Sequence, residues 1–447
     1  MAAVSIIVTT YNIEQYVEQC LASVAAQTLS EIEVLVVDDG SSDSTPAKIE
    51  AFCAKDPRFV PVLLGENSPG GVATAANAGL DRATAPWVGF VDGDDFVEPT
   101  MFQRLVEAAT ANDTDLAMCQ YMEIDDATGE RKNPADAHRW ADLDRDVYRL
   151  DVENRKAFLR FISVPWRKLY RRDLIEDNKI RFPAGDYFYE DNPFHWFSIL
   201  SADSIALVPA VLCYHRMGRS GQTMSTADAR LFQIFRHHDT IYAWLTERRL
   251  LDAYETSLIG WVISQLEWIG RRTPLKLQRE LFDILVPIFA HYTTDTVDKA
   301  LREGHKGVAA HRLSLAVAKR EYGTFARALS SRPDTTNPVV TAVYHLRHAG
   351  PRHTAVLTGR YLRNRLERLR SGRMVRGLTG VARSGGRSAR MDVMFGLTVL
   401  QHQLIDLRQQ LTDVQDHLDR IEARLDSPGM AEAAGEVHQA GTDRSGT

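Results

Sequence analysis

Cysteine is scarce in this chain and follows no metal-binding or disulfide pattern. The four thiols, Cys20, Cys53, Cys119 and Cys213, lie far apart among 447 residues, and no two of them form a C-x-x-C pair. A zinc ribbon or a disulfide scaffold needs paired or dense cysteines. We therefore expect buried free thiols and a reducing compartment.

Long apolar runs are also lacking. No stretch approaches the ~20 consecutive apolar residues of a membrane-spanning helix. Residues 1–4 lack the basic region that opens a secretory signal. We expect a cytoplasmic protein that can still be peripheral on the cytoplasmic face of the cell membrane. The net charge of −6 is modest, so the overall composition gives no case for nucleic-acid binding.

Glycine-rich phosphate loops are missing as well. No G-x-G-x-x-G follows the first predicted strand, and the chain contains no G-x-x-x-x-G-K-S/T. Both motifs hold phosphates through backbone N–H groups at the start of a helix. A nucleotide bound by this chain would therefore be held by carboxylates, with a metal carrying its phosphates.

The segment that organises the chain is residues 87–95, Trp-Val-Gly-Phe-Val-Asp-Gly-Asp-Asp. The apolar run predicts a strand buried on both faces, which ends in Asp92, Asp94 and Asp95. Open α/β sheets bind ligands at this end of their strands. Three close carboxylates repel one another unless a cation neutralises them, and Mg²⁺ would leave positions for substrate phosphate. The alternative is an acidic surface turn.

Strand and helix patterns alternate through the first half of the chain. The sequence predicts strands at 4–10, 33–38, 59–64, 87–92 and 116–121, with helices at 13–27, from about 46, at 72–83 and at 100–111. This alternation predicts a parallel sheet with right-handed crossovers. Asp38 and Asp39 would then share an edge with Asp92. Residues 123–150 are polar and are interpreted as an excursion loop.

Four blocks in the first two hundred residues resemble the family 2 glycosyltransferases. They are VSIIVTTYNIEQYVEQCLASVAAQTLSEIEVLVVDDGSSDST, GGVATAANAGL, WVGFVDGDDFVEP and the Glu-Asp pair of YEDNPF. The resemblance implies a glycosyltransferase A fold, which is an α/β fold with a mostly parallel nucleotide-binding sheet flanked by helices. It also implies inverting transfer of a sugar from a UDP-sugar, with Mn²⁺ or Mg²⁺ as the cofactor.

The resemblance also implies roles for single residues at the donor site. Thr9 and Tyr11 would line the base pocket, and Asp39 would accept from the uracil edge. Asp92 would lie near the ribose. Asp94 would bind the metal–diphosphate, and Asp95 would share the metal role.

Further donor contacts follow from the later blocks. The family often has Arg-Asn where this chain has Ala76-Asn77, so a cation is missing beside the donor contact expected at Asn77. Lys168, Arg216 or Arg219 would contact the diphosphate. The alternative for these cations is a solvated basic loop. His215 is a candidate metal ligand, and the alternative is a packed or exposed imidazole.

Inversion requires a base on the acceptor side of the sugar. Asp191 matches the family's usual base, with Glu190 beside it as a second catalytic candidate. One carboxylate within hydrogen-bond reach of the acceptor hydroxyl suffices. The alternative is that Asp191 caps the helix that begins near Pro193, and the two roles are compatible.

The second half of the chain is predicted to be helical and then coiled. Residues 1–227 are expected to form the catalytic domain and residues 228–332 a helical domain, where Trp261 and Trp268 share one helix face. Residues 333–391 contain an arginine-rich stretch. A membrane-surface segment, a solvated linker and an RNA-binding arm are its three interpretations.

Residues 392–426 carry leucines, with a valine and an isoleucine, at alternating spacings of three and four. This pattern predicts a coiled coil and hence a homo-oligomer, while the alternative is one amphipathic helix packed back on the domain. Residues 427–447 are rich in glycine, alanine and serine and are expected to be disordered.

The expected function is therefore hexosyl or N-acetylhexosaminyl transfer to a hydroxyl of a surface polysaccharide or teichoic-acid-like polymer. Two other functions compete with this interpretation. A sugar nucleotidyltransferase also uses carboxylates and a metal, and a non-catalytic oligomeric scaffold would keep the fold alone. The presence of Asp92, Asp94 and Asp191 together argues against the scaffold.

Overall fold

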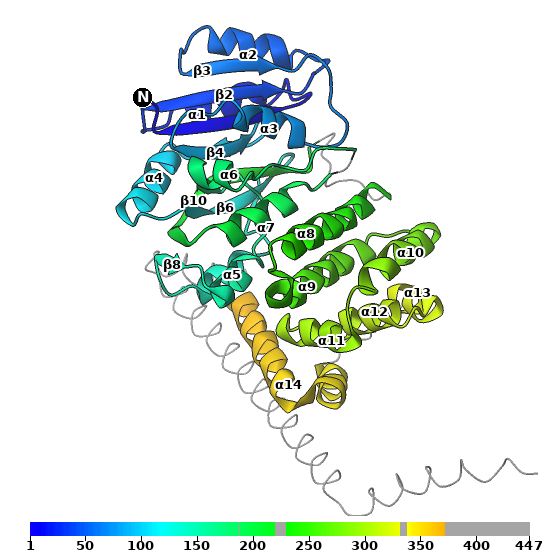
Figure 1. The fold of residues 1–447 in the computed structure, drawn as a ribbon. Helices are drawn as coiled ribbons and strands as arrows, with labels where there is room; N and C mark the ends of the chain where they lie inside the picture. Colours follow the sequence, from blue (N-terminus) through cyan, green and yellow to red (C-terminus); the bar gives the residue numbers. More distant parts are fainter. Residues whose placement is uncertain (187, 220–228, 331–337, 372–447) are drawn as a thin grey trace, which may run out of the picture. The chain divides into compact units, whose positions relative to one another are not determined.

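The computed structural model describes residues 1–186, 188–219, 229–330 and 338–371. The chain divides into two compact units, residues 1–333 and 334–447 (Figure 1). The first unit contains both the expected catalytic region and the helical region that follows it.

One sheet organises the first unit. Its strands are β1 (Val4–Thr10), β2 (Ile32–Asp38), β3 (Phe59–Leu63), β4 (Trp87–Asp92), β5 (Phe96–Val97), β6 (Leu116–Asp125), β7 (Arg131–Lys132), β8 (Val147–Arg149), β9 (Lys168–Arg171) and β10 (Ser204–Met217). The order is β3-β2-β1-β4-β9-β6-β10-β5, with β7 paired to β6 and β8 to β10. The β1–β2, β2–β3, β1–β4 and β6–β10 pairs are parallel, whereas β9 runs antiparallel between β4 and β6. The predicted mostly parallel sheet is confirmed.

The register places the acidic strand ends at one edge. Thr10 of β1 is paired with Asp38 of β2, and Thr9 is paired with Asp92 of β4. β4 is buried along its apolar run, as predicted, and only its last residue is partly exposed. The carboxylates that follow β2 and β4 therefore open at the carboxyl edge of the sheet.

Helices pack on both faces of this sheet. Those of the first region are α1 (Val17–Ala25), α2 (Thr45–Cys53), α3 (Ala73–Leu80), α4 (Met101–Ala111), α5 (Val152–Phe158), α6 (Arg172–Asp177) and α7 (Asp191–Ser201). Gly89 of β4 faces Phe102 of α4, whereas the next residue, Phe90, packs edge-on against Phe194 of α7. Successive strand residues point to opposite faces, so α4 and α7 cover opposite faces.

Residues 123–150 are more structured than the predicted loop. They contain β7, the 3-10 helix η1 (Ala137–Asp142) and β8, and both short strands pair with the sheet. Asp136 is 3% exposed and forms an ion pair with Arg167, 2.8 Å from Oδ2 to the guanidinium. A buried salt bridge therefore fixes this segment, which its polar composition could not indicate.

The helical pattern predicted after residue 228 is present. It comprises η3 (Ala229–Phe235), α8 (Arg236–Glu247), α9 (Leu251–Gly270), η4 (Leu275–Leu277), α10 (Gln278–Phe289), α11 (Thr294–Glu303), α12 (Val308–Ala318) and α13 (Tyr322–Ser330). α8 packs on α7 and α9 packs on α5, so helices of this region contact those that cover the sheet. Of the two tryptophans that share a face of α9, Trp261 is buried and Trp268 is half-buried.

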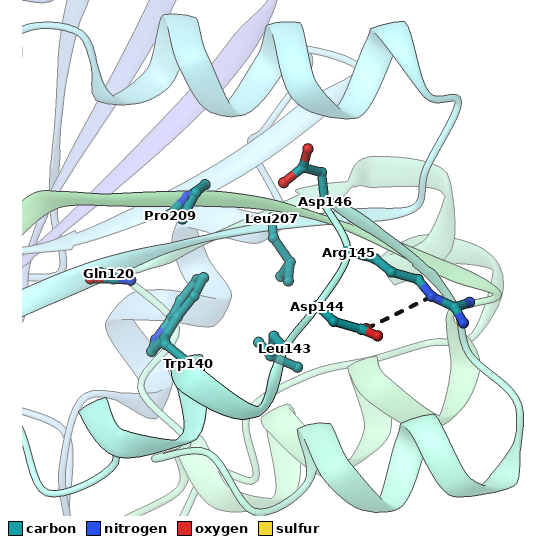
Figure 2. A pocket seen from close by; sticks show the side chains of 8 residues that line it. All are labelled: Gln120, Trp140, Leu143, Asp144, Arg145, Asp146, Leu207 and Pro209. Atoms are coloured by element: carbon teal, nitrogen blue, oxygen red, sulfur yellow. Dashed lines mark ion pairs between the residues drawn. The ribbon is translucent and has the colours of Figure 1, made fainter.

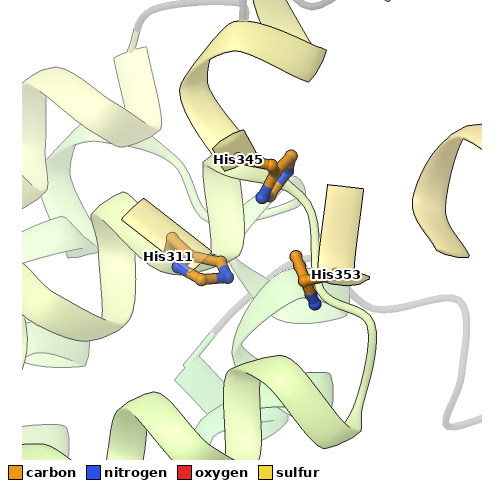
Figure 3. A group of neighbouring side chains, drawn as sticks. All are labelled: His311, His345 and His353. Atoms are coloured by element: carbon orange, nitrogen blue, oxygen red, sulfur yellow. The ribbon is translucent and has the colours of Figure 1, made fainter. Parts of the chain in front are cut away.

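The second unit is described only over α14 (Pro338–Ser371). Gly350 breaks this helix with φ 81° and ψ 170°, immediately before Pro351. The rings of His345 and His353 lie 5.1 Å apart across the break. Figure 3 labels both residues, and it also labels His311 of α12. The predicted coiled coil and the tail lie outside the described residues. No helix in the described ranges is long and apolar enough to cross a membrane.

Candidate active site

Two carboxylates and an imidazole meet at the carboxyl edge of the sheet. Asp92 ends β4, Asp95 follows in the turn before β5, and His215 lies near the end of β10. Their possible ligand atoms all lie within 4.8 Å of one another. His215 Nδ1 is 2.9 Å from Asp95 Oδ2, and the imidazole stacks on Trp166 at 5.3 Å between ring centroids. His215 is therefore packed and also placed at the acidic cluster.

Burial and mutual repulsion perturb the protonation of this cluster. Burial, with the charges of Asp95 and Asp94, raises the pKa of Asp92 to about 8. Burial also raises the pKa of Asp95. Burial alone would lower the pKa of His215, but the neighbouring Asp95 outweighs it and raises the pKa to about 9. The cluster thus holds protons that a bound cation would displace.

This donor set fits a divalent cation. Carboxylate oxygens suit both Mg²⁺ and Mn²⁺, while imidazole is a ligand of softer metals than Mg²⁺. The group that the structure brings together differs in one member from the predicted ligands Asp94, Asp95 and His215. Asp92 joins the cluster, whereas the Asp94 carboxylate pairs with Nε of Arg219.

Arg216 donates hydrogen bonds to the acidic turn between β4 and β5. Its backbone N–H donates to Asp95 Oδ1 at 2.7 Å, and its Nε donates to the carbonyl of Asp94 at 2.9 Å. The rest of the guanidinium donates to Asp126 at 2.9 Å and to Gln19 at 2.8 Å, and it lies over the ring of Tyr16. The predicted diphosphate contact is thus a residue that shapes the turn between β4 and β5.

The residues expected around a base lie at the ends of β1 and β2. Thr9 is nearly buried and its carbonyl accepts from the N–H of Gly93 at 2.9 Å, which ties β1 to the acidic turn. Tyr11 is 46% exposed at the end of β1, so its ring is available to a ligand. The carboxylate of Asp39 is buried and accepts from the Ser68 hydroxyl at 2.7 Å.

Asn77 and Lys168 have protein partners in the structure. The Asn77 amide exchanges two hydrogen bonds with the backbone of Phe182, at 2.7 and 2.9 Å, and so joins α3 to the segment before Asp191. Lys168 is 1% exposed and donates to the carbonyl of Val164 at 2.6 Å. Burial lowers the pKa of Lys168 well below its ordinary value, while nearby Asp191 opposes that shift. Lys168 is therefore placed near the expected base.

Asp191 lies in the first turn of α7. Burial raises its pKa to about 6, and the charge of Lys168 opposes the shift. Asp191 also raises the pKa of Asp92, although burial and the charges of Asp95 and Asp94 contribute more to that shift. The turn before α7 is strained, because Tyr189 has φ 69°. A left-handed backbone at an aromatic residue costs roughly 1–3 kcal/mol and is typical of functional sites.

Glu190 has a structural partner. Its Oε1 accepts from the N–H of Ala73 at 2.8 Å, at the first residue of α3. The carboxylate is 2% exposed, and burial raises its pKa to about 7. Gly71 leaves room for it, since a Cβ there would lie 2.5 Å from Oε1. Glu190 therefore joins the segment before α7 to α3.

Several residues of the site were not found from the sequence. The side chain of Asn192 donates to Asp191, Ser68 donates to Asp39, and Trp166 supports His215. Each partner is distant in sequence or lacks a charge, so no local pattern marks it. Asn192 alone carried a signal, since it directly follows the Glu-Asp pair.

A separate hollow with a volume of about 230 Å³ lies beside β6 and β10 (Figure 2). The lining residues are Gln120, Trp140, Leu143, Asp144, Arg145, Asp146, Leu207 and Pro209. None of these belongs to the acidic cluster or to the base segment, so the hollow is not part of the candidate active site.

The fold resembles solved structures. The crystal structure of S. aureus TarS in complex with UDP-GlcNAc aligns with a TM-score of 0.59 at 21% identity, covering 74% of this chain and 91% of that chain. At this identity the likeness concerns the fold alone. Together with the acidic strand ends, it defines the class as an α/β domain of the glycosyltransferase A type.

Sequence comparisons then place the chain. The model of glycosyl transferase family 2 matches residues 5–178. EpsH of Bacillus subtilis, named as a glycosyltransferase, is 31% identical over 264 residues, which are 58% of this chain and 74% of that protein. Uncharacterized glycosyltransferase EpsJ of the same organism is 33% identical over 214 residues, 48% of this chain and 60% of that protein. The chain belongs to glycosyl transferase family 2, and its match spans less than two thirds of EpsJ.

Proposed function

We propose that the chain is an inverting, metal-dependent glycosyltransferase that uses a UDP-sugar. The observation that carries the proposal is the meeting of Asp92, Asp95 and His215 at the carboxyl edge of the sheet, where their possible ligand atoms lie within 4.8 Å of one another. Asp191, at the start of α7, is the proposed base, and burial raises its pKa to about 6. UDP-GlcNAc in the TarS complex supports a uridine donor through likeness of fold. The acceptor proposed from the family resemblance is a hydroxyl of a surface polysaccharide or teichoic-acid-like polymer.

The proposed chemistry assigns one step to each part of the site. Asp191 accepts the proton of the acceptor hydroxyl while the oxygen of that hydroxyl bonds to the anomeric carbon of the donor sugar. The bond from that carbon to the diphosphate breaks, and its electron pair leaves with the nucleoside diphosphate. Asp92, Asp95 and His215 would hold Mn²⁺ or Mg²⁺, which supplies positive charge to the leaving diphosphate. Tyr11 offers an exposed ring for the base.

The released product separates this proposal from its rivals. The full chain is incubated with Mn²⁺, a panel of nucleotide sugars and a polymeric acceptor, and UDP and pyrophosphate are both measured. UDP release that increases with acceptor supports glycosyl transfer. In a second incubation the full chain receives UTP and a sugar 1-phosphate, and pyrophosphate release there would instead indicate a nucleotidyltransferase. No turnover in either incubation would favour the scaffold.

Asp191→Asn tests the base. We expect it to abolish transfer while UDP binding, measured by calorimetry, stays unchanged, because the amide cannot accept the proton. Asp283→Asn is the matched control, since this carboxylate is 54% exposed on α10 in a surface ion pair. Transfer at the normal rate by Asp191→Asn would show that the base assignment is wrong.

We further propose that the chain forms a homo-oligomer through residues 392–426, which carry the unbroken leucine pattern. Linked active sites would raise the effective concentration of a repetitive acceptor. Light scattering on the full chain tests this directly, and a monomeric mass at micromolar concentration would refute it.

A further inference from the structure

Asn192 forms a hydrogen-bonded hub beside the proposed base. Its Oδ1 accepts from the Ser163 hydroxyl at 2.9 Å and from the indole Nε1 of Trp261 at 3.1 Å. Its Nδ2 donates to the carbonyl of Tyr189 at 2.9 Å and to Asp191 Oδ1 at 3.3 Å. The side chain is buried, so water does not compete for these bonds. All the bonding positions that face the protein are in use.

The partners fix which way the amide faces. The indole N–H of Trp261 can only donate, so it requires the oxygen of Asn192. The carbonyl of Tyr189 and an ionised Asp191 can only accept, so they require the NH₂ group. A flipped amide would set its oxygen against two acceptors and its nitrogen against the indole donor, so three of the four bonds would be lost and only the one to the Ser163 hydroxyl could be remade. The carboxylate of Asp191 is thereby held through one of its oxygens.

Trp261 belongs to α9, in the helical region that follows the sheet. A second helix of that region also contacts the base segment, since His237 of α8 donates from Nε2 to the carbonyl of Phe188 at 2.7 Å. The strained turn at Tyr189 thus has hydrogen bonds on both sides. These contacts reach the backbone and the amide of the base segment, which makes them more specific than apolar packing.

We propose that Asn192 and Trp261 are positioning residues that fix the carboxylate of Asp191 for proton transfer. The inference rests on the proposed function, because it takes Asp191 as the base. It assigns the helical region a part in the rate of transfer, in addition to its packing on the sheet. Donor binding is outside this role, since none of the residues in the hub belongs to the acidic cluster.

Trp261→Phe in the full chain is the first test. The substitution removes the indole donor and keeps an aromatic ring. We expect kcat for transfer to fall about fivefold, the effect of one lost neutral hydrogen bond, with KM for the donor unchanged. Trp244→Phe is the matched control, because the indole of Trp244 on α8 stacks on Phe197 of α7 at 4.7 Å between ring centroids, and its N–H makes no hydrogen bond among the described residues. We expect its kcat to equal that of the parent chain.

A double-mutant cycle separates positioning from stability. If Trp261 acts through the amide, Trp261→Phe should cost little further rate in an Asn192→Ala background. The same fivefold loss in both backgrounds would overturn the inference, as would an equal loss in Trp244→Phe. If Asn192→Ala does not fold, Ser163→Ala replaces it. Loss of both donors to Oδ1 of Asn192 frees the amide to rotate. The fall in kcat of the double variant Ser163→Ala, Trp261→Phe should therefore exceed the product of the two single falls. A fall equal to that product would overturn the inference.

The outcome for Asp191→Asn distinguishes failure of the base assignment from failure of the positioning role. Turnover that survives in Asp191→Asn removes the base assignment and this inference with it. Loss of turnover in Asp191→Asn, with full kcat in Trp261→Phe, leaves the base assignment in place and removes only the positioning role.

Discussion

The buried ion pair between Arg167 and Asp136 should dominate the stability of the excursion between β6 and β9. Both side chains are nearly inaccessible, at 0% and 4% exposed. The guanidinium also donates to the carbonyl of Ile162 at 2.8 Å, and it lies 5.3 Å from the ring centres of both Tyr121 and Phe161. Asp136→Ala would leave this guanidinium buried among aromatic rings without its counter-charge.

The expected loss is about 3–5 kcal/mol in the free energy of unfolding, the usual cost of removing one partner of a buried pair. Asp283→Ala is the control for an exposed pair, because the ion pair of Asp283 with Arg279 is exposed and should contribute less than ~0.5 kcal/mol to the free energy of unfolding. The assay is urea unfolding followed by tryptophan fluorescence and by far-ultraviolet circular dichroism, whose transitions must coincide for the free energy to be defined. A loss below ~1 kcal/mol in Asp136→Ala would refute the reasoning, since it would mean that the Arg167 charge is not truly buried.

Three further predictions follow from the site. Gly71→Ala should slow transfer, because a Cβ would meet the carboxylate of Glu190 at 2.5 Å and push the base segment from α3. Gly323→Ala is the steric control, because a Cβ there meets open space, and the thermal stability of both variants is measured beside their rates. The kcat/KM for transfer should fall about tenfold per pH unit below pH 6, because the pKa of Asp191 is about 6 and the base must be ionised; a flat profile from pH 7 to 4.5 would contradict the assignment. Burial lowers the pKa of His237 to about 4, against about 6.5 in the unfolded chain. The contribution of the neutral imidazole to folding stability is therefore complete above pH 6.5 and is lost as the pH falls to 4, which costs up to about 3 kcal/mol. This acid destabilisation should be absent in His237→Gln, as measured by urea unfolding at pH 7 and pH 4.5.

The sheet and the acidic edge could be predicted from the sequence because their signals are local. An apolar run that stops at carboxylates describes both the strand and its functional end, as β4 and Asp92 show. The pairing of side chains is different, because it depends on packing between distant segments. Asp94 pairs with Arg219, and the Asn77 amide pairs with the backbone of Phe182, in each case across more than a hundred residues. No spacing rule connects such partners, so the protein contacts of Asp94 and Asn77 could not be predicted from the sequence.

The proposed donor side and the proposed base side of the site are built by different kinds of contact. On the donor side, parallel strand ends bring Asp92 and its neighbours together, so the register of the sheet sets the geometry. On the base side, Asp191 begins a helix, and hydrogen bonds to its neighbours Glu190 and Asn192 come from α3, from Ser163 in the segment between α5 and β9, and from α9. A sheet register is shared by many bonds and is insensitive to one substitution, whereas the base depends on single bonds. Substitutions in the helical region should therefore change the rate of transfer without changing donor affinity, and those at the strand ends should change both.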